Sequence, residues 1–241
     1  MSVASYRENP GTNAGITFNP EGFLTGSRRS LPIALSVFAY GLVFGMLARQ
    51  AGLSLAESVF MSGLVFAGAS QFAALALWQA PLPVAAIIIT TLVVNLRHLL
   101  MGAALCPWFS RLSRLKAYGS LFFMNDESWA LTMASLSRGE KNAAFLLGSG
   151  LTVFVFWLAA TIVGGPLGGV LQDPSLWGLD FAFTAVFLAL LVGLWKGKSD
   201  ILPWAVAAVV ALAASHWLPG KWYIILGGLL GSCVGVVRHA D

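Results

Sequence analysis

Long stretches of the chain are apolar on every face that a helix would present and contain no charged side chain. The longest runs from Ser58 to Leu96, and five more cover residues 30–48, 142–172, 181–195, 201–220 and 222–237. One helical crossing of a bilayer needs about 20 apolar residues, whereas strands of a membrane barrel alternate in polarity over about 10 residues. The pattern therefore predicts an all-α, polytopic membrane protein with about seven to eight membrane segments, some of them broken or re-entrant.

A polar N-terminal part precedes the predicted membrane segments. Residues 1–27 are rich in Gly, Asn, Pro and Ser and lack the apolar core of a signal peptide. We expect a flexible tail there and one transmembrane domain over residues 28–241. We expect a break or cap in the fifth segment at Gly164-Gly165-Pro166. The segments are expected near residues 31–49, 58–78, 84–106, 118–136, 143–170, 181–195, 201–217 and 222–237.

Basic residues indicate an orientation but conflict with a simple count of segments. Lys and Arg flank membrane segments mainly on the cytoplasmic side, which places both termini and four clusters there: Arg28-Arg29, Arg111–Lys116, Arg138 with Lys141, and Lys196 with Lys198. Three segments separate the first two clusters, and one separates the second from the third, so strict alternation fails. Either the segments interrupted at Asn95–His98 and Asn125–Glu127 are re-entrant or broken, or the basic-residue rule is violated once.

Polar side chains inside the apolar segments form the candidate functional set. Charges are costly in a bilayer, so intramembrane charges mark substrate or proton pathways. If Arg97 pairs with one acid, the pKa of that acid falls, while burial raises the pKa of a second acid and lets it load and release a proton. The candidates for substrate binding or proton coupling are Gln71, Asn95, Arg97, His98, Asp126 and Glu127.

Most of these candidates also have a purely structural interpretation. Arg97 can reach the interface as a helix-end anchor, and His98 can bond a backbone carbonyl within a core. Asp126 and Glu127 can cap a helix start, where the helix dipole favours acids. Gln71 is a large amide that packing alone does not require, so a substrate or ion contact is the hypothesis at that position.

Small residues at helical spacing predict close contacts between helices. Gly41 and Gly45 form a GxxxG pair in the first segment, a spacing that lets two helix backbones approach. In the second segment Gly63, Ala67 and Ser70 share one face. We expect these five positions to serve helix packing.

Composition excludes several other functions. The chain is 58% hydrophobic and 10% charged, whereas soluble domains are about one quarter charged. The net charge of +4 comes without the basic stripe that nucleic-acid binding requires. The chain contains no G-x-S-x-G, H-E-x-x-H or phosphate-loop motif. We therefore expect no enzymatic activity, no cofactor, no metal site and no nucleic-acid partner.

Two specific stretches resemble the AzlC family, the large subunits of bacterial branched-chain amino acid exporters of the AzlCD, BrnFE and YgaZH type. The first runs from Gly41 to Phe72 and ends in AGASQF, and the second, NLRHLLM, lies within Val94 to Leu105. The acidic pair Asp126-Glu127 and the stretch Asp180 to Phe187 also fit. The resemblance covers most of the chain from about Arg28 onward.

The resemblance implies a secondary exporter of leucine, isoleucine, valine and often methionine, driven by the proton gradient. It also implies a small AzlD-type membrane subunit as partner and a bacterial cytoplasmic (inner) membrane location. A zwitterionic substrate would need Arg97 or broken-helix amides for its carboxylate, and Gln71, Asn95 or an acid for its ammonium group. A channel, or an assembly subunit whose small partner supplies the transport site, remains the alternative.

Overall fold

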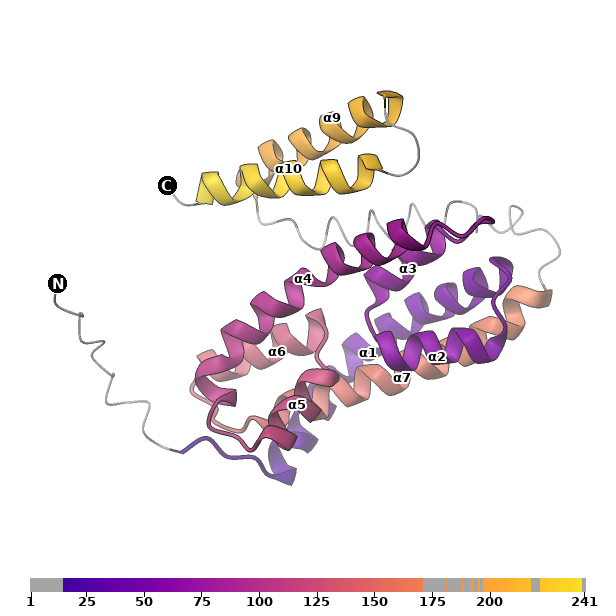
Figure 1. The fold of residues 1–241 in the computed structure, drawn as a ribbon. Coiled ribbons are helices and arrows are strands. Elements are labelled where there is room, and N and C mark those ends of the chain that lie inside the picture. The colour runs from indigo at the N-terminus through magenta and orange to yellow at the C-terminus, as the bar shows by residue number, and fades with distance from the viewer. Residues whose placement is uncertain are drawn as a thin grey trace. The chain divides into compact units, whose positions relative to one another are not determined.

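The computed structural model describes residues 15–170, 181, 188, 192, 195, 197–217 and 222–239. Regular structure in these ranges is helical apart from an isolated bridge between Thr17 and Asn142. Four described helical segments are long and apolar enough to cross a membrane, which agrees with the predicted all-α membrane fold. Figure 1 shows the helices α1 (Pro20–Gln50), α2 (Leu55–Val65), α3 (Gly68–Ala76), α4 (Val84–Phe109), α5 (Arg114–Phe122), α6 (Asp126–Ser137), α7 (Ala144–Val170), α9 (Ile201–Trp217) and α10 (Trp222–His239), with a 3-10 turn at Lys198–Asp200.

Two compact units share the long helices. The first unit contains Met1–Phe38 and His98–Trp157, and the second contains Ala39–Arg97 and Leu158–Asp241. Helices α1, α4 and α7 therefore each contribute residues to both units. Helix α1 begins at Pro20, so residues 20–27, which the sequence assigned to the tail, are helical. The predicted segment at 181–195 lies almost entirely outside the described residues.

Apolar side chains from three helices, α4, α6 and α7, and from the loops before α6 and α7 form the core of the first unit. Trp129 of α6 packs on this core, and its indole Nε1 donates to the carbonyl oxygen of Met101 on α4 at 3.1 Å. Phe123, after α5, contacts Phe154 of α7 edge to face. The buried core residues are Met101, Leu105, Phe109, Met124, Leu136, Ala143 and Leu146.

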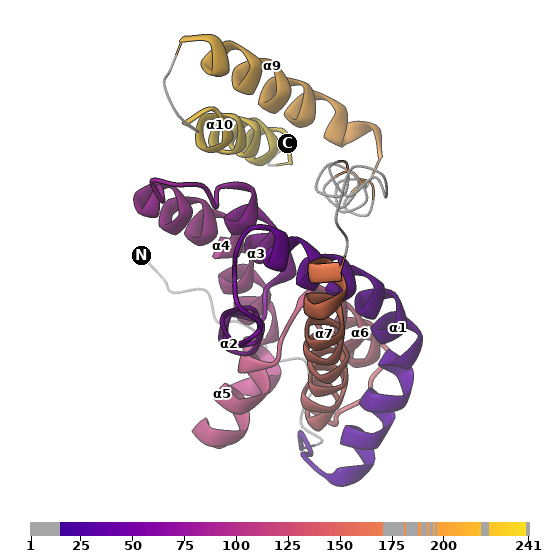
Figure 2. The same ribbon diagram turned by 90° about the vertical axis from the view of Figure 1, so that its right-hand side faces the viewer.

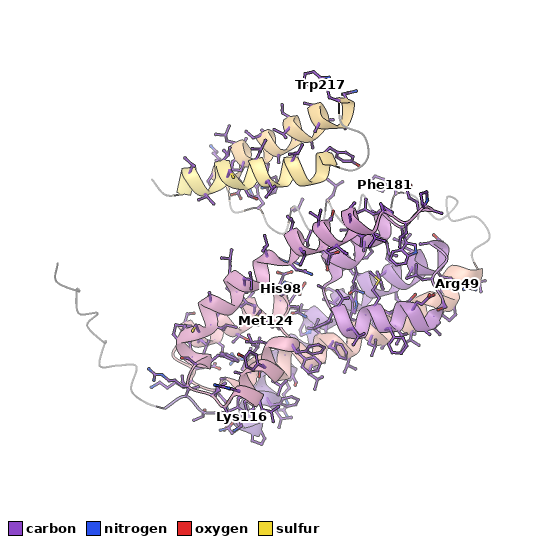
Figure 3. The ribbon with its side chains drawn as sticks, in the orientation of Figure 1. Arg49, His98, Lys116, Met124, Phe181 and Trp217 are labelled. Carbon is purple, nitrogen blue, oxygen red and sulfur yellow. The ribbon has the colours of Figure 1, made fainter. Side chains whose placement is uncertain are left out.

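The predicted interruption at Asn125–Glu127 is confirmed. Helix α5 ends at Phe122 and α6 begins at Asp126, with Met124, labelled in Figure 3, in the turn between them. The side-chain oxygen of Asn125 accepts from the backbone N–H of Ser128 at 2.8 Å, and the hydroxyl of Ser128 accepts from the backbone N–H of Asn125 at 3.0 Å. Such a reciprocal cap satisfies backbone donors that a helix start leaves open.

Helices α1 and α7 lie side by side and run in the same direction (Figures 1 and 2). In the second unit, a Cβ added to Gly164 would collide with the carbonyl oxygen of Leu42, and one added to Gly168 would lie 2.5 Å from that of Met46. Leu42 precedes Met46 along α1, and their partners Gly164 and Gly168 follow in the same order along α7, so the two helices are parallel. Gly26 and Gly148 allow the same close approach in the first unit, against the backbone of Phe145 and Phe23.

The same glycines explain why the predicted break at Gly164-Gly165-Pro166 is wrong. Helix α7 continues through these residues to Val170. Gly164 serves the contact with α1 rather than a change of direction, and helix interiors in membranes tolerate proline when the surroundings satisfy the freed backbone groups.

The interruption predicted at Asn95–His98 is also wrong, because α4 runs unbroken from Val84 to Phe109. The side-chain nitrogen of Asn95 donates to the Ser70 hydroxyl of α3 at 3.3 Å. A polar residue in a membrane helix needs a partner, and a neighbouring helix supplies one here without any change in the backbone.

Helices α9 and α10 pack against each other as an antiparallel pair (Figures 1 and 2). A Cβ on Gly227 would lie 2.8 Å from the carbonyl oxygen of Ala207, and one on Gly231 would lie 3.0 Å from that of Pro203. The indole rings of Trp195 and Trp204 meet edge to face at 5.0 Å near the start of α9.

An ion pair joins α1 to the loop after α6 through Glu140, an acid whose pKa is lowered. The Ser135 hydroxyl donates to Glu140 at 2.5 Å and does most to lower the pKa of that carboxyl, and the Arg29 guanidinium at 3.0 Å lowers it further. A lowered pKa adds stability above the ordinary carboxyl pKa, and this stability is lost as pH falls through the folded-state value.

We therefore expect wild-type protein in detergent to lose more thermal stability than Glu140→Gln when the pH falls below about 4.3, the ordinary pKa of a glutamate. The measurement is the melting temperature of both proteins between neutral and acid pH. The substitution removes the titrating group and keeps the side-chain length. Parallel pH profiles would show that Glu140 contributes nothing to acid sensitivity.

Candidate functional site: a buried polar network at a helix break

The predicted second membrane segment is not one helix but two, and its interior breaks at Phe66 and Ala67. Phe66 ends α2 with φ 41° and ψ 46°, and Ala67 precedes α3 with φ −139° and ψ 87°. Among the residues that the structure describes, Phe66 is the only one other than glycine that has a positive φ. Such backbone is strained for a residue with a large side chain, and strain of this kind clusters at functional sites. The chain reverses direction at this point (Figure 1).

Helices α2 and α3 differ in how the backbone groups at their starts are satisfied. Helix α2 starts with a complete cap, in which the Ser54 hydroxyl accepts from the Glu57 N–H at 3.2 Å and the Glu57 carboxylate accepts from the Ser54 N–H at 2.7 Å. Helix α3 starts after Ala67, whose methyl group cannot accept a hydrogen bond. The first four N–H groups of a helix have no partner within it and carry a partial positive charge. The start of α3 is therefore suited to an anionic group.

Gln71 joins the two halves of the broken segment. Its side chain is completely buried, and its amide nitrogen Nε2 donates to the Ser62 hydroxyl of α2 at 3.2 Å. The Ser62 hydroxyl in turn lies 2.9 Å from the Thr161 hydroxyl of α7. The amide oxygen Oε1 of Gln71 is also buried and has no hydrogen-bond partner within the described residues. An unsatisfied buried acceptor costs about 1–3 kcal/mol.

A second branch of the network reaches α4. The Ser70 hydroxyl donates to the Ala67 carbonyl at 2.9 Å and accepts from Asn95 at 3.3 Å. Ser62 and Ser70 are buried, and Asn95 is partly buried. The network therefore links α2, α3, α4 and α7 within the second unit. Of the predicted candidates, it contains Gln71 and Asn95, each in its own branch, and the two branches meet along α3.

The network described above does not include the remaining candidates. Arg97 belongs to the second unit and is partly buried, whereas His98, Asp126 and Glu127 belong to the first. Asp126 and Glu127 occupy the first turn of α6 and are partly buried. That position fits the structural interpretation, because a helix start favours carboxylates, and it leaves proton coupling as a hypothesis for them.

The predicted packing residues have different surroundings. Gly41, Gly45, Ala67 and Ser70 are buried, and a Cβ on Gly45 would lie 2.6 Å from the carbonyl oxygen of Thr161 on α7. A Cβ on Gly63 would meet nothing within 4 Å among the described residues. Gly45 thus sits at a close contact of α1 with α7, while Gly63 faces open space.

Two hydroxyl residues of this site, Ser62 and Thr161, and the helix break at Phe66 were not predicted from the sequence. Ser62 and Thr161 are single hydroxyl residues in apolar helices, where such residues commonly bond their own backbone, and nothing in the sequence pairs them. Phe66 carries no glycine or proline signal for a break. The one available signal was Gln71, whose amide demands a partner at membrane depth.

Comparison with known proteins assigns the chain to a family. The family model described as AzlC protein matches residues 32–171. The chain is 30% identical to the inner membrane protein YgaZ of Escherichia coli over 90% of this chain and 91% of that protein. It is 28% identical to the branched-chain amino acid transport protein AzlC of Bacillus subtilis over 58% of this chain and 57% of that protein. It is 34% identical to an uncharacterized membrane protein of Archaeoglobus fulgidus over 73% of this chain and 77% of that protein. No solved structure matches. The chain belongs to the AzlC family.

Proposed function

We propose that this chain is the large membrane subunit of a secondary exporter for the branched-chain amino acids leucine, isoleucine and valine, together with methionine, coupled to protons. A membrane transport role is supported by the family and by a relative named as a branched-chain amino acid transport protein. The single observation that carries the proposal is the buried polar network around Gln71, at a helix break within otherwise apolar segments.

The network supports transport because it has little value for stability. Burial of polar groups costs free energy unless their hydrogen bonds are replaced, and the Gln71 oxygen has no replacement among the described residues. Broken membrane helices are tolerated where they line a cavity or a site, and transporters commonly bind substrates at such breaks. A purely structural helix pair gains nothing from a strained Phe66 or an open acceptor.

The proposal includes a bacterial cytoplasmic membrane, cytoplasmic termini and a small AzlD-type subunit. The membrane location is supported by the relative named as an inner membrane protein and by the apolar helices. Helix α4 leaves large apolar side chains exposed along its length, among them Ile88, Leu92, Leu96 and Leu99. Lipid or the small subunit would cover this surface, since a continuous exposed apolar surface is unfavourable in water.

The test is reconstitution into liposomes, with and without the small subunit, under an imposed pH gradient. We expect leucine, isoleucine and valine to leave loaded vesicles faster than glycine or lysine, and the gradient to accelerate their movement. Leucine flux that does not respond to the gradient would indicate a channel. If every amino acid left liposomes that contain both subunits no faster than it leaves protein-free liposomes, the proposed function would be contradicted.

A further inference from the structure

We propose that the break between α2 and α3 binds both charged ends of a free α-amino acid, with the carboxylate at the start of α3 and the ammonium group on the Gln71 amide oxygen. This inference rests on the proposed function and assigns its substrate site. It limits the substrate class to zwitterions that carry both groups on one carbon.

The ammonium position follows from the way that Gln71 is held. The Ser62 hydroxyl accepts from Nε2 and thereby fixes the amide plane, while Thr161 fixes Ser62. The opposite atom, Oε1, is left as a buried acceptor with no partner in the described ranges. An ammonium group carries three donors, so it can satisfy this oxygen and still bond to neighbouring acceptors.

The carboxylate position follows from the uncapped start of α3. Ala67 supplies no side-chain acceptor, so the N–H groups of the first turn remain suited to an external anion. Gln71 belongs to the same first turn, since its backbone N–H bonds to the Ala67 carbonyl at 2.9 Å. Its side chain also reaches back to α2, so the acceptor and the helix start border the same break. In an α-amino acid, one carbon atom separates the two charged groups, which suits two recognition elements so close together.

The apolar surroundings suit an aliphatic side chain. Phe66 lies at the break, and Phe72, which follows Gln71, contacts Phe44 of α1 edge to face at 5.8 Å. All three rings are buried. Because Gln71 is completely enclosed, the substrate can enter and leave only when the packing around α3 opens, as alternating access requires.

The first experiment compares ligands that each lack one charged group. Inhibition of leucine counterflow is measured with unlabelled leucine, with 4-methylpentanoate, which lacks the ammonium group, and with 3-methylbutylamine, which lacks the carboxylate. We expect wild-type protein to prefer leucine over both analogues by at least roughly tenfold, because a site built for a polar group rejects a ligand without it. Equal inhibition by leucine and 4-methylpentanoate would overturn the proposal.

The variants separate the two halves of the site. Gln71→Met removes the acceptor, so its preference for leucine over 4-methylpentanoate should be lost, whereas Gln71→Glu retains an acceptor oxygen and should keep this preference. Ala67→Asp places a carboxylate at the start of α3, so it should lose leucine inhibition and favour 3-methylbutylamine. Gly63→Ala is the control: its added methyl group would meet nothing within 4 Å among the described residues, so this variant should bind leucine as wild type does.

The outcomes distinguish this inference from the proposed function. If wild-type protein moves a different zwitterion instead of leucine, the function is wrong, and the same variants tested on that zwitterion still test the site. If leucine moves normally and Gln71→Met keeps the wild-type preference, the ammonium assignment is wrong. If Ala67→Asp binds leucine normally, the carboxylate assignment is wrong. Melting temperatures show whether each variant is folded, and the wild-type ligand series tests the site without any variant.

Discussion

Gly148→Ala should strongly destabilise the protein or prevent it from folding. The added Cβ would collide with the carbonyl oxygen of Phe23 on α1, and both groups belong to helix backbones that cannot rotate away. Overpacking of this kind costs about 1–3 kcal/mol or more, against a total stability of about 5–15 kcal/mol. The melting temperature and the monodisperse fraction in detergent measure the effect.

Gly102→Ala is the matched control, since a Cβ at Gly102 would meet nothing within 4 Å among the described residues. Both glycines lie in long helices of the first unit, and alanine is favoured over glycine in a helix by about 1 kcal/mol. Gly102→Ala should therefore be neutral or slightly stabilising. If both variants melted at the wild-type temperature, the close contact of α1 with α7 would be wrong.

Proton-driven efflux should depend on the acids at the start of α6. Asp126→Asn or Glu127→Gln should reduce the stimulation of leucine efflux by a pH gradient at least tenfold, which corresponds to about 1.4 kcal/mol. Each change removes a carboxylate that could carry a proton and keeps the side-chain size. Initial efflux rates from liposomes, with and without the gradient, give the stimulation directly.

Glu21→Gln provides the control for these two variants. Glu21 also lies in the first turn of a helix, but it is exposed and lies near the N-terminal end of α1. It should leave the gradient response unchanged. If Asp126→Asn and Glu127→Gln matched Glu21→Gln, both acids would serve only the start of α6, and the coupling proton would have to be carried elsewhere.

The sequence predicted those features that depend on local composition. Charge-free apolar runs predicted α4, α7 and α9 to within a few residues, and the apolar part of α1, whose helix begins earlier, at Pro20, because length and hydropathy decide whether a helix can cross a bilayer. The interruption at Asn125–Glu127 was predictable because three polar residues stand together in an apolar segment and acids are favoured at a helix start.

Features that depend on contacts between helices were not predictable. The break at Phe66 fell within an apolar run, and the unbroken α4 carries the polar Asn95. In both cases the polar side chain bonds to a hydroxyl on another helix: the hydroxyl of Ser62 accepts from Gln71 across the break, and that of Ser70 accepts from the Asn95 amide nitrogen. The sequence therefore predicted Gln71 and Asn95 as site residues and Ser70 as a packing residue, but not the hydrogen bonds that these side chains make.

The parallel course of α1 and α7 constrains how the chain is threaded through the bilayer. Two parallel helices that both cross a membrane cross it in the same sense, so the chain between them makes an odd number of crossings. Helix α4 is one crossing, so α2–α3 and α5–α6 either both traverse the membrane or both return to the side from which they came. If α2–α3 and α5–α6 both return, one side of the membrane carries all three basic clusters: Arg28-Arg29, Arg111–Lys116 and Arg138–Lys141. Of the two arrangements that parity allows, the one with two returning segments therefore removes the conflict that the basic residues alone had raised.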